Sequence, residues 1–321
     1  MKNIFITGGG GYIGTNLTNE LLSEGYNVTV LDTFWFGNYL KKHKKLKILK
    51  RDIRNITKKD INKIDCIIHL ASIANDPAAE LDAKLTWDVN VLATYKLINL
   101  AVAEKVKKFI FASSGSVYGI KKEKKVTEKL SLEPISEYNK SKMVGERVLL
   151  SYKKDIDITI LRPATVCGYS PAMRLDVAIN ALTFGALKNN LITIFGGKQI
   201  RPNLTMHDMV SAYKFSLKKN VKKNKPNNKI IFNLGFENLS IDNMAKRIQK
   251  TLKSKSKILI KPSNDPRSYR QNSDRIIKDG FLPEKKIEDA ILEIQKNFNS
   301  KKITQKEKFY RINTLKMISA K

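Results

Sequence analysis

The stretch Thr7-Gly8-Gly9-Gly10-Gly11-Tyr12-Ile13-Gly14 follows a short apolar run, Asn3 to Thr7, and leads into a helical pattern that begins near Tyr12. In such a strand, turn and helix, Gly8 permits the tight turn, Gly11 lets backbone N–H groups approach a pyrophosphate, and Gly14 lets the helix lie close to the strand. The positive end of the helix then faces the phosphates. The turn is typical of a dinucleotide site lined by Gly8, Gly11, Tyr12, Ile13 and Gly14, although glycines also form ordinary loops.

The first half of the chain alternates short apolar runs with helical patterns. Uniformly apolar strands separated by helices predict an α/β fold whose parallel sheet is covered on both faces and joined by right-handed crossovers. The expected strands are Asn3 to Thr7, Asn27 to Asp32, Lys47 to Leu49, Asp65 to Leu70, Lys108 to Ala112 and Asp157 to Leu161. Two long helices are expected at Leu85 to Glu104 and Ser136 to Tyr152.

Beyond Pro163 the pattern is less regular, and a strand at Ile230 to Leu234 is expected to rejoin the main sheet. Helices are expected near Leu175 to Lys188, at His207 or Asp208 onward, at Ile241 to Leu252 and at Pro283 to Phe298. The expected domains are a dinucleotide-binding domain at 1–165, to which 203–240 returns, a smaller mixed α/β substrate-binding region at 166–202 and 241–298, and a basic C-terminal tail at 299–321 with little periodicity.

The composition is that of a globular protein with an unusual charge. The 321 residues are 42% hydrophobic, which is enough for a sizeable core, but 60 Lys and Arg face 30 Asp and Glu, giving a formal charge of +30. A nucleic-acid-binding protein that uses this basic surface is therefore an alternative. The excess is mostly lysine without interleaved aromatic residues, so we favour a solvated surface and do not expect a nucleic-acid partner.

Cysteine usage and hydropathy point to the cytoplasm. Cys66 and Cys167 form no CxxC pair, and no histidine cluster accompanies them, so we expect free thiols and no metal site. No apolar window reaches the roughly 20 residues that span a bilayer, so we expect no membrane association. The start MKNIFITGGG lacks the pattern of a secretory signal.

Asp32 ends the second expected strand, 18 residues after Gly14. At this position a carboxylate can accept hydrogen bonds from the adenosine ribose hydroxyls and repel a 2′-phosphate, which favours NAD over NADP. An aspartate that only caps a turn would give the same sequence pattern, so that alternative stays open.

A second group of polar residues follows the fifth strand. Ser113-Ser114-Gly115-Ser116-Val117-Tyr118-Gly119 comes first, and Tyr138-Asn139-Lys140-Ser141-Lys142 comes early in a helix. Tyr138 and Lys142 share one helix face, so the ammonium can lower the pKa of the tyrosine and reach a cofactor ribose. Such a pair is common on solvated helices, and it gains meaning only beside a dinucleotide site.

With these motifs in place, the sequence resembles the extended short-chain dehydrogenases, which include UDP-galactose 4-epimerase and the sugar-nucleotide dehydratases. The resemblance covers nearly the whole chain and implies a Rossmann-type doubly wound parallel sheet that binds NAD. It also implies that Asp52 contacts adenine and that Asn90 supports the site. The matching positions are TGGGGYIG, Asp32, Arg51-Asp52-Ile53, His69-Leu70-Ala71, Asn90-Val91, SSGSVYG and YNKSK, so that Ile53, Leu70 and Ala71 join the cofactor-binding set.

The resemblance makes Ser114, Tyr138 and Lys142 the catalytic trio, with Tyr138 and Lys142 also contacting the cofactor. His69 is better interpreted as structural. Leu161 to Gly168 looks like the family's LRxxxxYG stretch, but Cys167 replaces the usual tyrosine.

Substrate-binding residues are expected in the second half of the chain and in the serine-rich loop. Arg201-Pro202-Asn203 followed by His207-Asp208 resembles a family segment in which Arg201 holds a diphosphate, because an arginine fork donates two parallel hydrogen bonds to phosphate. The further candidates are Ser114, Ser116, Asn180, Arg267 and Arg270, of which Arg267 and Arg270 are alternatives for one role.

The expected reaction is oxidation of the C4 hydroxyl of the sugar in a nucleotide-diphosphate sugar. Tyr138 as phenolate would remove the hydroxyl proton while a hydride passes to NAD, and Ser114 would steady the oxygen. The family's 4,6-dehydratases place an Asp-Glu pair directly after the catalytic hydroxyl residue, where this chain has Gly115 and Ser116. We therefore favour 4-epimerisation over dehydration, with a dehydrogenase or ketone reductase as the alternative.

The two long helices predict a homodimer. Leu85, Val89, Leu92, Leu97, Leu100 and Ala101 on the first, with Met143, Val144, Val148, Leu149 and Leu150 on the second, offer more apolar surface than one sheet face readily covers. In the resembling family this pair joins its symmetry mate, and two-fold contacts are the commonest closed arrangement. The same stripes could instead be wholly intramolecular core.

Overall fold

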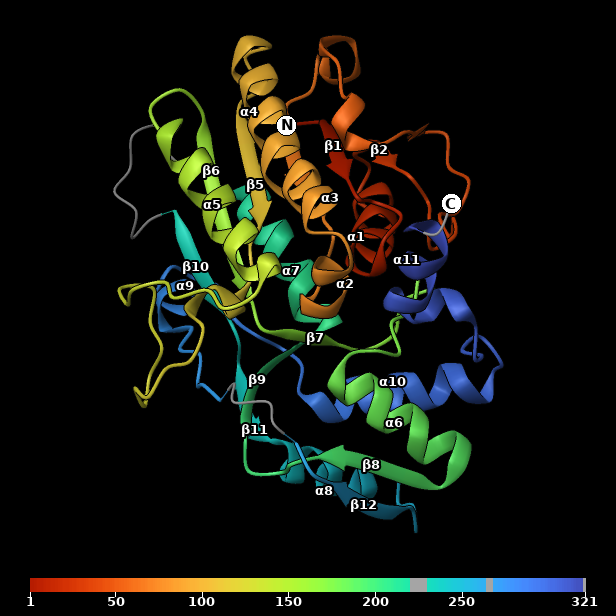
Figure 1. Ribbon diagram of the computed structural model, residues 1–321. Coiled ribbons are helices and arrows are strands. Elements are labelled where there is room, and N and C mark those ends of the chain that lie inside the picture. Colours follow the sequence, from red (N-terminus) through yellow and green to blue (C-terminus); the bar gives the residue numbers. More distant parts are fainter. Residues whose placement is uncertain (220–229, 264–267, 320–321) are drawn as a thin grey trace.

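A seven-stranded sheet forms the centre of the protein, whose computed structural model describes residues 1–219, 230–263 and 268–319. Every strand pair in this sheet is parallel, which confirms the predicted α/β Rossmann-type fold. In spatial order the strands are β3 (Leu46–Lys50), β2 (Asn27–Asp32), β1 (Asn3–Thr7), β4 (Cys66–His69), β5 (Lys108–Ala112), β6 (Asp157–Pro163) and β10 (Ile231–Leu234) (Figure 1).

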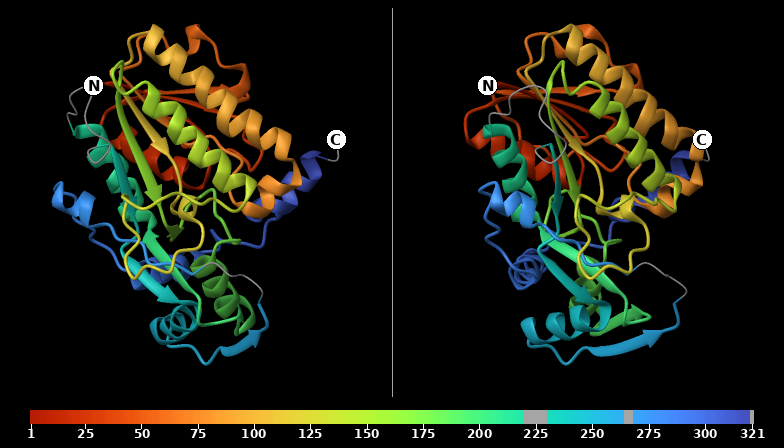
Figure 2. Two further views of the ribbon diagram at one scale, coloured as in Figure 1. Left: turned by 60° about the vertical axis from the view of Figure 1, so that its left-hand side comes forward. Right: turned by 90° about the vertical axis from the view of Figure 1, so that its left-hand side faces the viewer.

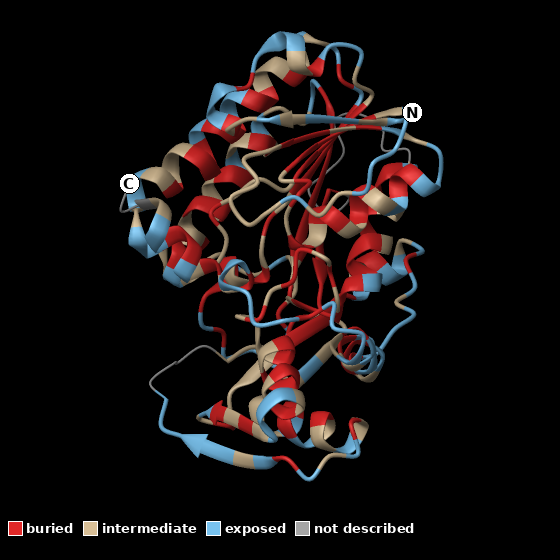
Figure 3. Ribbon diagram, turned by 90° about the vertical axis from the view of Figure 1, so that its right-hand side faces the viewer, coloured by how far each residue is buried: buried red, intermediate tan, exposed pale blue. Residues whose placement is uncertain are grey.

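The inner strands of the sheet are buried on both faces because they are apolar on both. In β1, Ile4 and Ile6 belong to one buried cluster and Phe5 to another. The first cluster receives α1 (Tyr12–Ser23) and α7 (Met206–Lys218), and the second receives α4 (Ala93–Ala103) and α5 (Glu137–Ser151). The inner strands are largely red when coloured by burial (Figure 3), whereas the edge strand β3 is exposed or half-buried. Helices α4 and α5 run side by side on one face in both views of Figure 2.

The first of the two expected long helices is interrupted. Residues 83–103 form α3 (Ala83–Trp87), a π-helical turn (Asp88–Leu92) and α4. Helix α2 (Asp76–Leu81) precedes them, capped by the Asn75 side chain. Wide π turns are frequent at functional sites, and this one carries Asn90.

A smaller body lies at the carboxyl end of the main sheet (Figure 1). Strands β7 (Thr165–Cys167), β9 (Ile200–Thr205) and β11 (Glu237–Ser240) form one small sheet, and β8 (Leu191–Phe195) pairs with β12 (Lys257–Lys261). Helices α6 (Ala178–Asn189), α8 (Ile241–Thr251) and α10 (Ile287–Asn299) share a core of their own, while the short α9 (Asp274–Lys278) lies beside β10.

The segment after Ser300 is folded, whereas its sequence predicts a tail with little periodicity. A short turn (Glu307–Phe309) and α11 (Arg311–Ser319) bring the chain back to α2, and both Phe309 and Leu315 are buried. Two buried apolar side chains in a lysine-rich stretch are too sparse a pattern to identify from sequence. Short turns also occur at Ile53–Asn55, Lys58–Ile61 and Gly115–Tyr118.

The part of the chain that the structure describes contains neither a membrane span nor a metal cluster. Within the described ranges no helix has the length and apolar character needed to cross a bilayer. The same ranges contain no group of His, Cys, Asp or Glu able to hold a metal ion. Cys66 and Cys167 are both buried free thiols, as expected.

Candidate active site

An open cavity lies at the carboxyl ends of β1, β2 and β4, where the glycine turn enters α1. Together with the solvent space at its mouth, it encloses about 1070 Å³ of empty volume. Its walls include many of the residues that the sequence singled out for cofactor binding, namely Gly8, Gly11, Tyr12, Ile13, Gly14, Asp32, Asp52, Ile53, Leu70 and Ala71.

Glycine is required at two positions of the turn. A Cβ on Gly8, whose φ is +71°, would lie 2.6 Å from the Ala71 backbone nitrogen, and a Cβ on Gly14 would lie 2.3 Å from the Gly8 carbonyl oxygen. The backbone of Gly8 is therefore packed against the segment that follows β4, and α1 against the turn. Helix α1 begins after Gly11 without a side-chain cap, so its first N–H groups are suited to an anionic ligand.

Asp32 holds the turn as well as lining the cavity. One carboxylate oxygen accepts from the Gly10 N–H at 2.9 Å, and the other accepts from the Phe34 N–H at 2.7 Å. Burial raises the pKa of Asp32 against these two hydrogen bonds. The turn-capping role left open by the sequence is thus real, and each oxygen keeps a lone pair for a ribose hydroxyl.

Asp52 caps the short turn that follows β3 and pairs with Arg54 at 2.9 Å. Burial alone would raise the pKa of Asp52, but the hydrogen bonds from Arg54 outweigh it and lower the pKa. Ile53 beside it is buried in the cavity wall. Asp52 is therefore an ionised acceptor at the edge of the cavity.

Asn90 supports the cavity from behind and does not line it. Its side chain accepts from the Ile73 N–H at 2.8 Å and donates to the Ile73 carbonyl at 3.1 Å and to the Ser141 hydroxyl at 2.9 Å. Because Ile73 is in the cavity wall and Ser141 is in α5, the amide ties the wall to the helix that carries Tyr138 and Lys142. His69 is also structural, buried between the Thr7 and Thr94 hydroxyls.

The structure brings Ser114, Tyr138 and Lys142 together after β5. Ser114 caps the Gly115–Tyr118 turn, lies 2.7 Å from the Ser116 hydroxyl and hydrogen-bonds Tyr138. The buried Lys142 donates to the Ala112 carbonyl at 2.9 Å and lies over the Tyr138 ring, 5.8 Å from its centroid. None of the three side chains lines the cavity described above.

The ionisation of this cluster is governed by burial. Burial raises the pKa of Tyr138 to about 12, although the Ser114 hydrogen bond lowers it. Burial also lowers the pKa of Lys142 to about 7, against the Glu146 carboxylate, which raises it. The expectation that Lys142 depresses the tyrosine pKa is not met here, because its ammonium lies over the ring face and bonds a backbone carbonyl.

A buried ion pair underlies the cluster. Glu146, one turn after Lys142, receives Nε and Nη2 of Arg162 at 2.8 and 2.6 Å and also the Ser113 hydroxyl. Arg162 further donates to the Tyr118 hydroxyl at 2.7 Å. The pair locks α5 to β6 and to the serine-rich loop.

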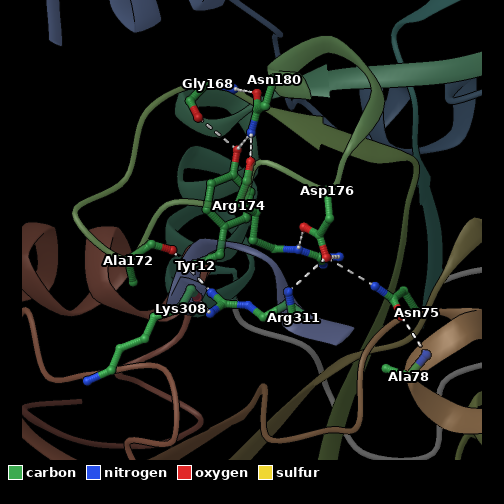
Figure 4. Close-up of polar contacts among 10 residues, drawn as sticks. All are labelled: Tyr12, Asn75, Ala78, Gly168, Ala172, Arg174, Asp176, Asn180, Lys308 and Arg311. Atoms are coloured by element: carbon green, nitrogen blue, oxygen red, sulfur yellow. Dashed lines mark hydrogen bonds and ion pairs between the residues drawn. The ribbon is translucent and has the colours of Figure 1, made fainter. Parts of the chain in front are cut away.

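The expected substrate residues are not brought to this cavity. Asn180 is buried, accepting from the Gly168 N–H at 3.0 Å and donating to the Tyr12 hydroxyl at 2.9 Å, so its side chain braces α1 against the smaller body (Figure 4). Arg201 is half-buried in β9, and Arg270 is exposed. Ser116 donates to Asn139 at the start of α5. Arg267 lies outside the described residues.

Two arginines in the cavity wall were missed from the sequence. Arg174 follows β7, and Arg311 opens α11 (Figure 4). Met173-Arg174-Leu175-Asp176 stands beside Asn180 in the sequence, but Arg311 lies in a segment that showed no usable pattern. Phe34, Trp35 and Phe36 line the wall as well, directly after Asp32, where aromatic residues were a visible signal.

These features fit a dinucleotide. The turn has no room for a Cβ at Gly8 or Gly14, the first helix has an uncapped N-terminus, and a carboxylate stands at the end of β2. Backbone amides and arginines suit phosphates, and Asp32 suits vicinal hydroxyls.

Comparison with known proteins gives the same family. A family model described as "NAD dependent epimerase/dehydratase family" matches residues 4–235. The UDP-glucose 4-epimerase of Lactobacillus helveticus is 30% identical over 270 residues, covering 76% of this chain and 81% of that protein. None of the relatives named here is a nucleic-acid-binding protein.

Solved structures share the fold over almost the whole chain. The UDP-glucuronic acid 4-epimerase from Bacillus cereus, in complex with UDP-glucuronic acid and NAD, has a TM-score of 0.78 at 26% identity, covering 92% of this chain and 99% of that one. The UDP-N-acetylglucosamine 4-epimerase from Methanobrevibacter ruminantium has a TM-score of 0.85 at 24% identity, covering 94% and 99%. With the glycine turn, Asp32 and the Ser114, Tyr138 and Lys142 cluster in place, the chain belongs to the NAD-dependent epimerase/dehydratase family.

Proposed function

We propose that this protein is an NAD-dependent 4-epimerase of a nucleotide-diphosphate sugar. The observation that carries the proposal is the grouping of the half-buried Ser114 and Tyr138 with the buried Lys142, which Asn90 ties to the wall of a cavity suited to a dinucleotide. The relatives named above support the substrate class, since their names specify UDP-sugars.

NAD would be held by residues of the cavity. The glycine turn and the start of α1 would receive the phosphates, Asp32 the adenosine ribose, and Asp52 with Ile53 the adenine end. Leu70 and Ala71 would form the wall behind the turn. When bound, NAD supplies a reversible acceptor for the hydride from the sugar carbon.

Tyr138 would take the proton from the sugar hydroxyl and later return it to the same oxygen. Its pKa, raised to about 12 by burial, makes the phenolate unfavourable without help. Ser114 helps by hydrogen-bonding the phenolic oxygen, which lowers the pKa of Tyr138. Lys142, whose ammonium lies over the Tyr138 ring, would hold the cofactor ribose. Glu146 favours the protonated form of Lys142.

The residues after Ser114 favour epimerisation over dehydration. Loss of water from a sugar needs an acid and a base at neighbouring carbons. Gly115 and Ser116 stand in those positions, and the Ser116 hydroxyl is engaged by Ser114 and Asn139. Arg201 remains our candidate for the substrate diphosphate, with Arg267 or Arg270 as a second cation.

The direct test is incubation with a panel of nucleotide sugars and catalytic NAD, with products identified by mass spectrometry and proton NMR. We expect one or more substrates to yield the C4 epimer at unchanged mass, without net NADH. A product lighter by one water would refute epimerisation in favour of dehydration. Stoichiometric NADH would instead establish a dehydrogenase.

We also propose that the protein is a homodimer of the cytoplasm. Leu92 and Tyr95, at the π turn and the start of α4, are 58% and 51% exposed, as befits an apolar face that meets a second copy. Leu97 and Ala101 of the same helix, by contrast, are fully buried in the core beneath, so the predicted apolar stripe is partly intramolecular. Two buried thiols are compatible with a reducing compartment.

A further inference from the structure

Helix α11 delivers Arg311 to the wall of the cavity formed by the glycine turn. The residue is only 5% exposed, and its guanidinium lies over the Phe36 ring at 3.9 Å. Nη1 donates to the Lys308 carbonyl at 3.0 Å and Nη2 to the Ala172 carbonyl at 3.2 Å (Figure 4). These contacts fix the plane of the guanidinium and leave further N–H donors for a ligand.

Among the described residues, no carboxylate forms an ion pair with Arg311. Asp176 forms a two-point pair with the neighbouring Arg174, at 2.9 and 3.1 Å, and meets Arg311 only through its backbone N–H at 3.4 Å. Across residues 1–219, 230–263 and 268–319, no carboxylate lies within 4.0 Å of the Arg311 guanidinium. The two buried guanidinium groups of Arg174 and Arg311 therefore have the single carboxylate of Asp176 between them.

A buried, unmatched cation is unfavourable unless a ligand supplies the opposite charge. Burial and the charge of Arg174 lower the pKa of Arg311 to about 9, against the carboxylates of Asp176 and Asp32, which raise it. At neutral pH the guanidinium is still protonated. The cavity wall therefore carries a fixed positive charge that calls for an anion.

We propose that Arg311 binds the diphosphate of the dinucleotide, so that α11 closes the cofactor site with a charge from the far end of the chain. The assignment rests on the proposed function. Nucleotide sugars carry a diphosphate too, but Arg311 stacks on Phe36, four residues after Asp32, and shares its cavity with Gly8 and Gly11. Its ligand is therefore the cofactor diphosphate and not the substrate diphosphate.

The test is calorimetric binding of NAD, ADP, adenosine and UDP to the full-length chain and three variants. Arg311→Gln removes the charge, Arg311→Lys keeps the charge without the planar fork, and Lys316→Gln removes an exposed charge from the same helix as the matched control. Loss of a charge-assisted contact should weaken NAD and ADP binding by roughly 10- to 100-fold in Arg311→Gln. Arg311→Lys should lose less, and Lys316→Gln should change binding less than about twofold.

Binding of adenosine and UDP distinguishes a lost phosphate contact from displacement of α11 and from a role of Arg311 in substrate binding. Adenosine has no phosphate, so its affinity should be the same for Arg311→Gln and the original chain, and UDP should also bind equally to both. An equal loss for adenosine would show that the variant merely displaces α11, and a loss confined to UDP would assign Arg311 to the substrate. Either result, or unchanged NAD binding, overturns the proposal. An original chain that binds no NAD would overturn the proposed function itself.

Discussion

Replacing Glu146 by Gln should strongly destabilise the protein, because the carboxylate neutralises a buried arginine. The Glu146 and Arg162 side chains are 1% and 4% exposed and are joined by two short hydrogen bonds. Burial alone would lower the pKa of Arg162, and the Glu146 charge outweighs it. Removing one partner of such a pair costs about 3–5 kcal/mol, a third or more of a typical free energy of unfolding.

Urea unfolding followed by tryptophan fluorescence and circular dichroism measures this loss. The chain has two tryptophans, of which Trp35 lines the cavity and Trp87 bonds Glu137 beside α5. In thermal unfolding, we expect Glu146→Gln to lower the Tm by roughly 5–10 °C. Glu20→Gln, which breaks an exposed pair with Lys214, is the matched control and should cost less than about 1 kcal/mol.

Two further measurements separate charge loss from a general packing defect. Replacing both Glu146 and Arg162 by Met removes the unmatched charge and should recover much of the lost stability. Glu146 raises the pKa of Lys142, so Glu146→Gln should lower that pKa further. If activity needs the Lys142 ammonium, the pH above which activity declines should therefore be lower in Glu146→Gln than in the original chain. A single variant within 1 kcal/mol of the original chain, or a double variant less stable than the single one, would refute this reasoning.

Three other substitutions test the site and the assembly. Tyr138→Phe should lower kcat by about 10²- to 10⁴-fold with the NAD affinity unchanged, and appreciable turnover would remove Tyr138 from its role. Asp32→Ser should weaken the binding of NAD and reduce the ratio of NAD affinity to NADP affinity, which titration of both cofactors can measure. A variant with the original affinity ratio would show that Asp32 serves only as a turn cap. Leu92→Glu should convert a dimeric mass to a monomeric one in light scattering at unchanged Tm, and a monomeric original chain would rule out the dimer.

The N-terminal half was predictable because its signals are local. Strands β1, β2 and β5 begin and end at the expected residues, since each is an apolar run bounded by turn residues. The glycine turn also depends on neighbours in sequence: Gly14 meets Gly8 within one loop. Where a few adjacent residues determine the geometry, the sequence pattern is sufficient.

Other features depend on distant parts of the chain and left no local signal. Arg311 reaches the cavity from a segment where only Phe309 and Leu315 are buried anchors. The pKa of Tyr138 likewise follows from how deeply the folded chain buries it, which the spacing to Lys142 does not reveal. Asn180 was expected at the substrate, but its amide is bonded to Gly168 within the smaller body and to Tyr12 of α1, and the second contact forms only when the two bodies meet.

The position of α11 has a consequence for synthesis on the ribosome. Every strand of the main sheet is translated by Leu234, whereas Arg311 emerges 77 residues later. Domains generally fold as units during translation, starting from the N-terminus. A nascent chain can therefore complete its sheet and present the glycine turn while one wall of the cavity is still missing. The sheet must therefore be stable without the dinucleotide, and the cofactor can bind with full affinity only after residue 311 has been synthesised.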